Sequence, residues 1–443
     1  MLRNTQKWYL IPSLAFLVLT IISGTWLRLQ WAWPQIDFPD VLQFRTDFLI
    51  HGHSHAALLG WVFLGLAGLI LQAGTRHRRL PQTGVALLGG FVTILTILLF
   101  AAFVREGYAP MSIALSTIHM LTSYIFAWIF FRHARTDGNI ASRYFLEGAV
   151  FWMVMATAGT WMLAAGRGMS PFWMDAAVQY YLHVLFNGWF FFALSGLAFR
   201  YFIAARYRRS VWPFWLMMAG LLPSLIPHLD ITDPSRWVIF AGIAGTILYA
   251  TGGMAIVLRV ILTMTGNCKF AAHHKFSARE YRSLIKTGLF PYLLWPGLMG
   301  AVVVLLLPAA MAWPDFRTIW MQSDFLVIGF IHLQLLVVLS SFLLLGLLRV
   351  CSAKRPDPLQ EQSDRPAIRF FRWLGRPVVP SVLFVAGSIL MVAVLFTTGW
   401  HQVQGSLPFY PVQKTLFFTG LMTTSGAAWL SGVLTAGLLH QNK

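Results

Sequence analysis

Long, uninterrupted apolar runs constrain this chain more than any other feature. They recur from one end of the sequence to the other, and a run of about 18 residues is long enough to cross a bilayer as a helix. Charged residues make up only 11% of the 443 residues, whereas a soluble domain carries about a quarter. A β-barrel needs short segments of alternating polarity, and these runs are continuous. We therefore predict an all-α integral membrane protein, with one polytopic domain over residues 1–443.

The apolar runs predict a bundle of about twelve transmembrane helices. The expected spans are 9–30, 49–73, 84–104, 111–132, 146–165, 179–203, 213–229, 237–262, 289–312, 324–348, 379–398 and 411–438. The seventh span is short and contains Pro213, Pro223 and Pro227. Proline is tolerated in the first turn of a helix, so we expect only Pro223 and Pro227 to kink or unwind this span.

The distribution of basic residues predicts the orientation of the chain. Alternate loops are rich in Lys and Arg, while the opposite loops carry mainly single arginines. The rich loops contain Arg76, Arg132, Arg206, Lys269 and Lys354, among others. Because basic loops stay in the cytoplasm, we predict that both termini are cytoplasmic, in a bacterial-type inner membrane. These loops explain the net charge of +18, so we expect membrane lipid and no nucleic acid as a partner.

Cys268 and Cys351 fall in the same loops, where a disulfide is not expected.

Seven histidines inside or at the ends of predicted spans are the candidate functional residues. An ionisable side chain within a membrane is costly and marks a functional site by default. In the predicted orientation, all seven lie in the outer half of the membrane. They are His51, His53 and His55 in the second span, His119 in the fourth, His183 in the sixth, His228 in the seventh and His332 in the tenth. Neutral imidazole is a ligand for haem iron and for copper, so the set predicts a metal or haem site near the outer face.

The spacing of the histidines within each span predicts which neighbours their side chains face. His51 and His55 are four residues apart and share a helix face, whereas His53 points nearly the opposite way. Asn187 follows His183 by one helical turn and is a natural hydrogen-bond partner for it.

Simpler interpretations of individual histidines stay open. A single histidine in a membrane span often has only a structural role, as a hydrogen-bond partner for a neighbouring helix. This interpretation stays open for His119. A histidine at a span end, such as His51 or His228, can be an interfacial residue. No Asp, Glu or Lys lies in the middle of a span, which argues against a proton pump built on ionisable relays.

The chain resembles subunit I of the haem–copper oxidase superfamily, which includes cytochrome oxidases and nitric oxide reductases. The resemblance rests on the histidines in the outer parts of the second, sixth, seventh and tenth spans. It also rests on the stretch HAALLGWVFLGLAGLI from His55 to Ile70, which is similar to the family's low-spin haem-ligand helix. The resemblance implies a low-spin haem ligand at His55 or His53, a copper ligand at His183 with His228 nearby, and a high-spin haem ligand at His332.

The sequence also departs from this family. The tenth span has His332-Leu333-Gln334 where the family has two histidines, and the seventh span has one histidine instead of a pair. Asn187 stands where oxidases have a tyrosine, and His119 has no counterpart. The resemblance therefore implies a divergent branch with an incomplete set of ligands.

From these features we predict a membrane protein that binds haem, copper or both, in respiratory electron transfer or in nitric oxide or oxygen chemistry. Whether it is an oxidoreductase or a non-catalytic carrier, sensor or assembly factor stays open. Implied partners are an electron-donor protein or quinol and other membrane subunits. Candidate contacts for haem propionates are the outer arginines Arg28, Arg45, Arg105, Arg167 and Arg236. The alternative is a transporter or channel with a histidine-lined outer site.

Overall fold

The chain folds into a bundle of helices. The computed structural model describes residues 2–39, 43–73, 82–133, 139–166, 168, 170–231, 234–265, 290–311, 314–352, 378–406 and 408–440. All secondary structure within these ranges is helical. Ten helices in the described part are long and apolar enough to cross a membrane. The prediction of an all-α multi-pass membrane protein is therefore confirmed. The basic loops around Arg76, Lys269 and Lys354, together with Cys268, lie outside the described residues.

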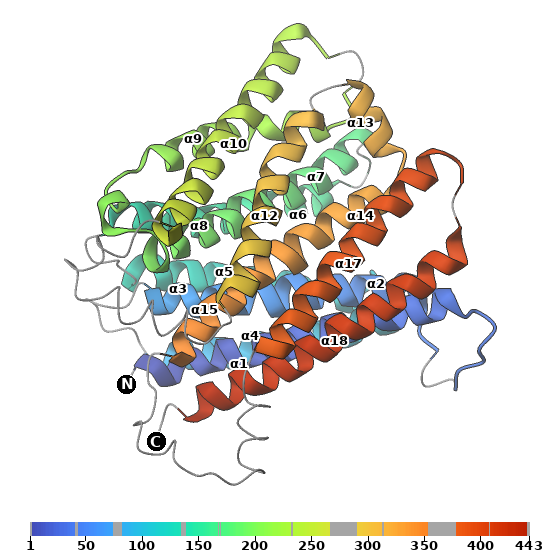
Figure 1. Cartoon of the computed structure of the whole chain (residues 1–443), viewed down its shortest axis with the longest axis horizontal. Helices are drawn as coiled ribbons and strands as arrows, with labels where there is room; N and C mark the ends of the chain where they lie inside the picture. Colours follow the sequence, from blue (N-terminus) through green and yellow to red (C-terminus); the bar gives the residue numbers. More distant parts are fainter. Residues whose placement is uncertain are drawn as a thin grey trace.

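The helices follow the predicted spans closely (Figure 1). The uninterrupted ones are α1 (Leu2–Ala32), α4 (Gln82–Glu106), α5 (Pro110–His133), α6 (Ile140–Ala165), α10 (Arg236–Thr265), α12 (Phe290–Met311), α17 (Val378–Val403) and α18 (Phe409–His440). The short helix α13 (Pro314–Met321) connects α12 to α14 (Asp324–His332).

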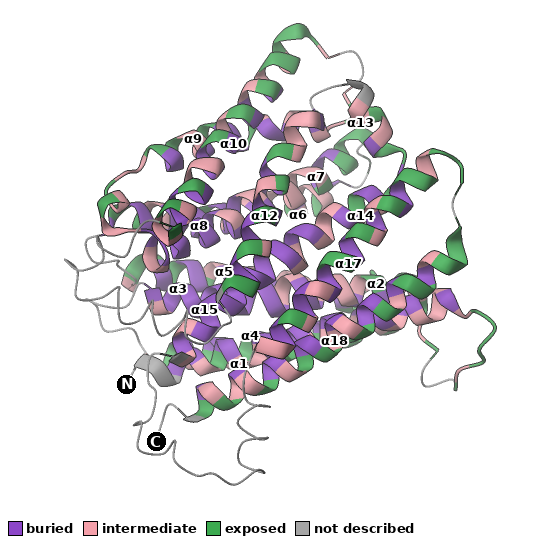
Figure 2. Ribbon diagram, viewed as in Figure 1, coloured by how far each residue is buried: buried purple, intermediate pink, exposed green. Residues whose placement is uncertain are grey.

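The outer surface of the bundle is apolar, as a lipid-facing surface must be. Burial is concentrated in the interior, and the outward faces of the helices are exposed (Figure 2). Large apolar side chains on α4 and α5 show this clearly: Leu87 is 68% exposed, Ile94 62% and Trp128 64%. A soluble monomer rarely exposes contiguous apolar surface of this kind, so the packing supports the membrane assignment independently of the hydropathy.

Three spans change from α-helix to π-helix in the middle. The second span consists of α2 (Thr46–His55), η2 (Ala56–Val62) and α3 (Phe63–Ala73). The sixth consists of α7 (Pro171–His183), η3 (Val184–Phe190) and α8 (Phe191–Tyr201), and the tenth of α14, η7 (Leu333–Leu339) and α15 (Ser340–Ser352). In each span the π segment begins directly after a histidine. Such segments are rare and often mark functional sites.

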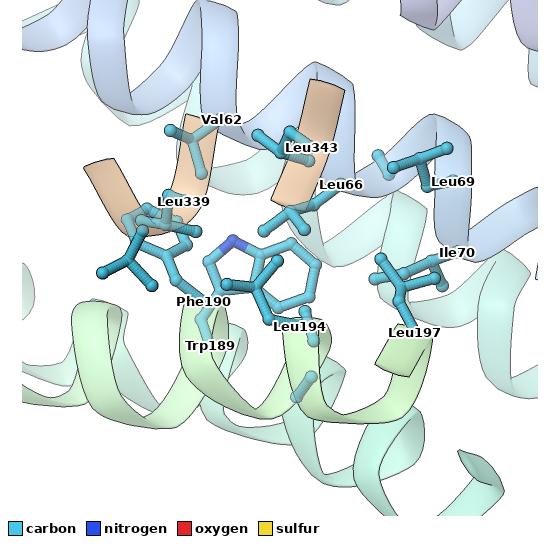
Figure 3. Close-up of a cluster of buried hydrophobic side chains, with 14 of the residues drawn as sticks. Val62, Leu66, Leu69, Ile70, Trp189, Phe190, Leu194, Leu197, Leu339 and Leu343 are labelled. Carbon is cyan, nitrogen blue, oxygen red and sulfur yellow. The ribbon is translucent and has the colours of Figure 1, made fainter. Parts of the chain in front are cut away.

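The π-broken spans meet at the centre of the bundle. Figure 3 shows Trp189 and Leu194 from the sixth span packed among Val62 and Leu66 of the second and Leu339 of the tenth. These side chains are buried. The indole N–H of Trp61 donates a hydrogen bond to the Ser340 hydroxyl, with the two atoms 2.9 Å apart. The three spans therefore form a common core around which the remaining helices pack.

The seventh span is short and changes its helix type, as its prolines predicted. It runs as α9 (Trp212–Leu221) and continues as a 3-10 helix, η5 (Pro223–His228). Glycines let it approach α10 closely, since a Cβ on Gly245 would lie 2.5 Å from the Cβ of Pro223. Small residues at such contacts allow backbones in a membrane to pack together. His228 is the last residue of η5.

The Gly245 contact predicts a measurable change in stability. Substituting Gly245→Ala should destabilise the protein by about 1–3 kcal/mol, because the added methyl group overpacks the contact with η5. The control is Gly432→Ala on α18, where a Cβ meets no atom within 4 Å. Thermal melts of the two detergent-solubilised variants check this: equal melting temperatures would contradict the close contact.

Candidate functional site

Six of the seven histidines form three groups around the central core, and the seventh, His119 on α5, packs against Phe63. His53 lies near His332, with ring centres 6.4 Å apart. His183 lies near His228, with ring centres 5.6 Å apart. The third group consists of His51 and His55 on α2, which share the neighbours Phe103 and Tyr108. His53 and His55 face different neighbours, as their spacing along the helix predicted.

Each ring of the His53–His332 pair has one nitrogen hydrogen-bonded to a backbone carbonyl. The Nδ1–H of His53 donates to the Thr20 carbonyl, at 2.9 Å. The Nδ1–H of His332 donates to the Ile328 carbonyl, at 2.8 Å. These bonds assign the proton of each neutral ring to Nδ1, which leaves Nε2 as the atom with a free lone pair. If the two Nε2 atoms face one another, an iron bound to both at about 2 Å would place the ring centres roughly 6.3 Å apart, close to the observed 6.4 Å.

Gly24 on α1 leaves space for the His53 ring. A Cβ on Gly24 of α1 would lie 2.8 Å from Cε1 of His53, so only glycine leaves room for the ring. His53 and His332 are both intermediate in exposure although they belong to the bundle interior. Both residues therefore keep some accessible surface within the bundle.

A buried arginine lies beside the same pair. Arg28 on α1 is 9% exposed and donates to Oε1 of Gln413, at 3.0 Å. Its guanidinium also lies 5.0 Å from the ring centre of Trp31. Arg28 lies four residues, about one turn, after Gly24 on α1, and Gly24 packs against the His53 ring. A buried cation whose hydrogen-bond partner here is a neutral amide fits the presence of an anionic group at the site.

The other candidate arginines are placed differently. Arg45 is exposed and pairs with Asp47 at 2.7 Å, and this hydrogen bond raises the pKa of the Arg45 guanidinium. Arg105 and Arg236 are exposed, and Arg167 lies outside the described residues. Of the described candidates, Arg28 is the one at the histidine pair.

His183 is fully engaged by hydrogen bonds. Its Nε2–H donates to the Leu221 carbonyl, at 2.9 Å, and lies 3.2 Å from the Ser224 hydroxyl. Its Nδ1 accepts from the Asn187 amide, at 3.3 Å, which confirms the predicted partnership. Because both nitrogens are in use, His183 has no free lone pair for a metal in this arrangement.

A cleft opens next to His183 and His228. It has a cavity volume of about 140 Å³ and is partly open to the exterior. Gln179, Asn187 and Gln334 supply its polar groups, and Met311 and Trp320 are among the apolar residues of its wall.

The third group lies on the other side of the second span. The Nδ1–H of His55 donates to the His51 carbonyl, at 2.9 Å, and its ring stacks on Phe103 with centres 4.0 Å apart. His119 is 3% exposed, and its Nε2 is buried with no hydrogen-bond partner. His51 lies against Tyr108, with ring centres 4.6 Å apart.

Among the described residues, no three His, Cys, Asp or Glu side chains converge to enclose a metal ion. The histidines therefore supply ligands in pairs at most. A pair suits a haem, because the porphyrin provides the other four donors to the iron.

No protein-family model and no curated protein matches the chain. The candidate site therefore rests on the geometry of its own residues.

One signal in the sequence was missed. His55 and His183 are each followed, five residues later, by the dipeptide Gly-Trp, as Gly60-Trp61 and Gly188-Trp189. This short repeat marks two of the three π segments, and comparing the sixth span with the second would have found it.

His183 should behave as a structural residue. Substituting His183→Leu leaves the Leu221 carbonyl and the Ser224 hydroxyl without their partner, which costs about 1–3 kcal/mol. We expect a lower melting temperature and an unchanged content of bound metal in the purified protein. A loss of metal without loss of stability would instead show that His183 is a ligand.

Proposed function

We propose that this protein is a membrane haem protein in which His53 and His332 are the two axial ligands of one iron. The observation that carries the proposal is the 6.4 Å separation of the two rings, with both Nδ1 atoms hydrogen-bonded to backbone carbonyls. The buried Arg28 would neutralise a haem propionate. Bound haem would supply a one-electron redox centre inside the apolar bundle.

Two histidine ligands favour electron transfer over gas chemistry. An iron with both axial positions filled has no open position for oxygen or nitric oxide. His183 has both nitrogens in hydrogen bonds, so a second metal at the position expected from the oxidase resemblance has little support. We infer a respiratory electron carrier of the haem–copper oxidase type, which receives electrons from a quinol or a donor protein and works beside other membrane subunits.

We further propose that the chain crosses a bacterial-type inner membrane twelve times, with both termini in the cytoplasm. The packing of α1 against α18 supports an even number of spans. Lys7, near the start of α1, donates to the carbonyl of Leu439 at the end of α18, while Arg28 and Gln413 meet at the opposite ends. The two helices are therefore antiparallel, and the chain begins and ends on one side (Figure 1).

A solute-transport function is the second candidate. The cleft beside His183 and His228 lies where the seventh span is broken into α9 and η5. Broken helices with binding groups at their ends are a feature of transporters. Purified protein that lacks haem would favour this candidate over the first.

Absorption spectroscopy tests the haem proposal. We expect the purified protein to show the reduced-minus-oxidised spectrum of a six-coordinate low-spin haem. His53→Ala and His332→Ala should each lower the haem content strongly, since each removes one axial ligand.

The matched control is His401→Ala, which changes an exposed histidine near the end of α17. This variant should keep full haem content. Haem that survives in both ligand variants, or that is missing from the unmodified protein, would overturn the proposal.

The charge of Arg28 predicts a change in reduction potential. A nearby cation disfavours the oxidised iron, so Arg28→Gln should lower the potential, by about 60 mV if the interaction is worth roughly 1.4 kcal/mol. Arg236→Gln, at an exposed position, should leave it unchanged. A redox titration of both variants measures this, and equal potentials would remove Arg28 from the site.

A further inference from the structure

The cleft beside His183 and His228 has room for one aromatic ring. Its volume is about 140 Å³, and a protein cavity of about 150 Å³ holds one benzene molecule. Its walls come from α7, η3, η5, α12, α13, α14 and η7, and the four α-helices lie together in the bundle (Figure 1). Neither His53 nor His332 lines the cleft, so it is separate from the space between the proposed haem ligands.

A buried amide without a partner faces this cleft. Gln334 in η7 is 9% exposed and lines the cleft, and its side chain makes no hydrogen bond with a described residue. Its amide atoms nevertheless keep accessible surface, which for a residue buried this deeply is the surface of the cleft. Buried polar groups are nearly always paired, and an unpaired one is costly. The Gln334 amide therefore indicates an occupant with hydrogen-bonding atoms.

The other polar groups of the cleft are also uncharged. The Asn187 amide nitrogen donates to His183, which leaves the Asn187 amide oxygen as an acceptor. Gln179 and His228 line the cleft as well, and an amide or a neutral imidazole can both donate and accept. No Asp, Glu, Lys or Arg is among the described residues that line it. These groups suit a neutral molecule better than an ion.

The rest of the wall is apolar, and its rim reaches the outer surface. The aromatic side chains of Phe186, Trp320 and Phe330 line the cleft, and aromatic side chains pack favourably against another ring. Met321 and Val327 also line it and are 48% and 37% exposed. An apolar chain attached to a ring in the cleft would leave between these two side chains towards the lipid.

The cleft lies against the helix that carries one proposed haem ligand. Phe330, Ile331 and Gln334 line the cleft, and His332 lies between them in the sequence. Each helical residue advances about 1.5 Å along the axis, so an occupant contacts the same turn of the tenth span that carries His332. A redox-active occupant would therefore be close enough to exchange electrons with the proposed haem.

We propose that this cleft binds the ring of a membrane quinone or quinol. Gln334, Asn187 and His228 would hydrogen-bond to its two oxygens, and its apolar tail would leave past Val327. A quinone combines a single small ring, no charge and an apolar tail. Its oxygens accept hydrogen bonds when oxidised and also donate them when reduced, which matches groups that do both.

The role of the quinol as electron donor rests on the proposed haem function, whereas binding to the cleft does not. In that role one quinol becomes one quinone. Its two electrons leave one at a time to ferric haem iron, which a further membrane carrier reoxidises between the two transfers. Its two protons go to His228 and to water at the mouth of the cleft.

Photoaffinity labelling of the full-length purified protein tests the proposal. The protein is placed in quinone-free lipid nanodiscs, an azido-ubiquinone is photoactivated, and labelled peptides are identified by mass spectrometry. We expect about one label per chain, on segments that line the cleft, and displacement of the label by decylubiquinone. Absence of labelling, or labelling confined to other segments, would overturn the proposal.

Two variants make the test specific. Gln334→Met keeps the size of the side chain but removes one hydrogen bond to the ring, so competition by decylubiquinone should weaken roughly 3- to 10-fold. Its melting temperature without quinone should not fall, because no hydrogen bond within the described protein is lost; a lower one would show a structural role instead. Val327→Trp fills the rim and should prevent labelling.

Two controls complete the experiment. Gln322→Met changes an exposed glutamine outside the cleft and should bind decylubiquinone like the unmodified protein. His53→Ala should lose haem and still be labelled, which separates failure of this proposal from failure of the haem proposal. Equal labelling and equal competition in folded Gln334→Met and Val327→Trp would contradict quinone binding in the cleft.

Discussion

The hydrogen bond from a histidine Nδ1 to a backbone carbonyl is the interaction on which the proposed chemistry depends. Inside a membrane an imidazole finds little water, so each ring nitrogen must be paired or be left available at a cost. At His53, His55 and His332 the bond to a carbonyl satisfies Nδ1 and leaves Nε2 as the unprotonated nitrogen. At His183 both nitrogens are satisfied within the protein. Histidine therefore keeps an available nitrogen at three of these positions and has a structural role at His183.

The π segments begin at three of these histidines. Each follows directly after His55, His183 or His332, and the wider turn changes the rotation of the helix at that point. The side chains after it turn into the common core, where Trp61 bonds to Ser340 and Trp189 is surrounded by apolar residues (Figure 3). The core fixes the three spans, and the histidines lie around its edge.

The sequence predicts most of the fold because a bilayer requires long apolar helices, and these are visible as apolar runs. Pro223 and Pro227 predicted a kink or unwinding in the seventh span, which instead continues as a 3-10 helix from Pro223. The partnership of His183 with Asn187 followed from their spacing. The pairing of histidines across helices could not be predicted, because it depends on how the helices pack and on register shifts within the π segments. The resemblance gave His55 or His53 as a haem ligand; the structure brings His53 to His332 and turns His55 to α4. His332 is thus paired with the second span, whereas the resemblance alone implied a separate high-spin site.

Electron paramagnetic resonance of the oxidised, purified protein tests the central claim most directly. The planes of the His53 and His332 rings are within 18° of parallel. Two axial imidazoles in nearly parallel planes give ferric haem a rhombic low-spin signal. The account predicts that signal in the unmodified protein and its loss in His332→Ala. A high-spin signal, or protein that contains no haem iron, would contradict it.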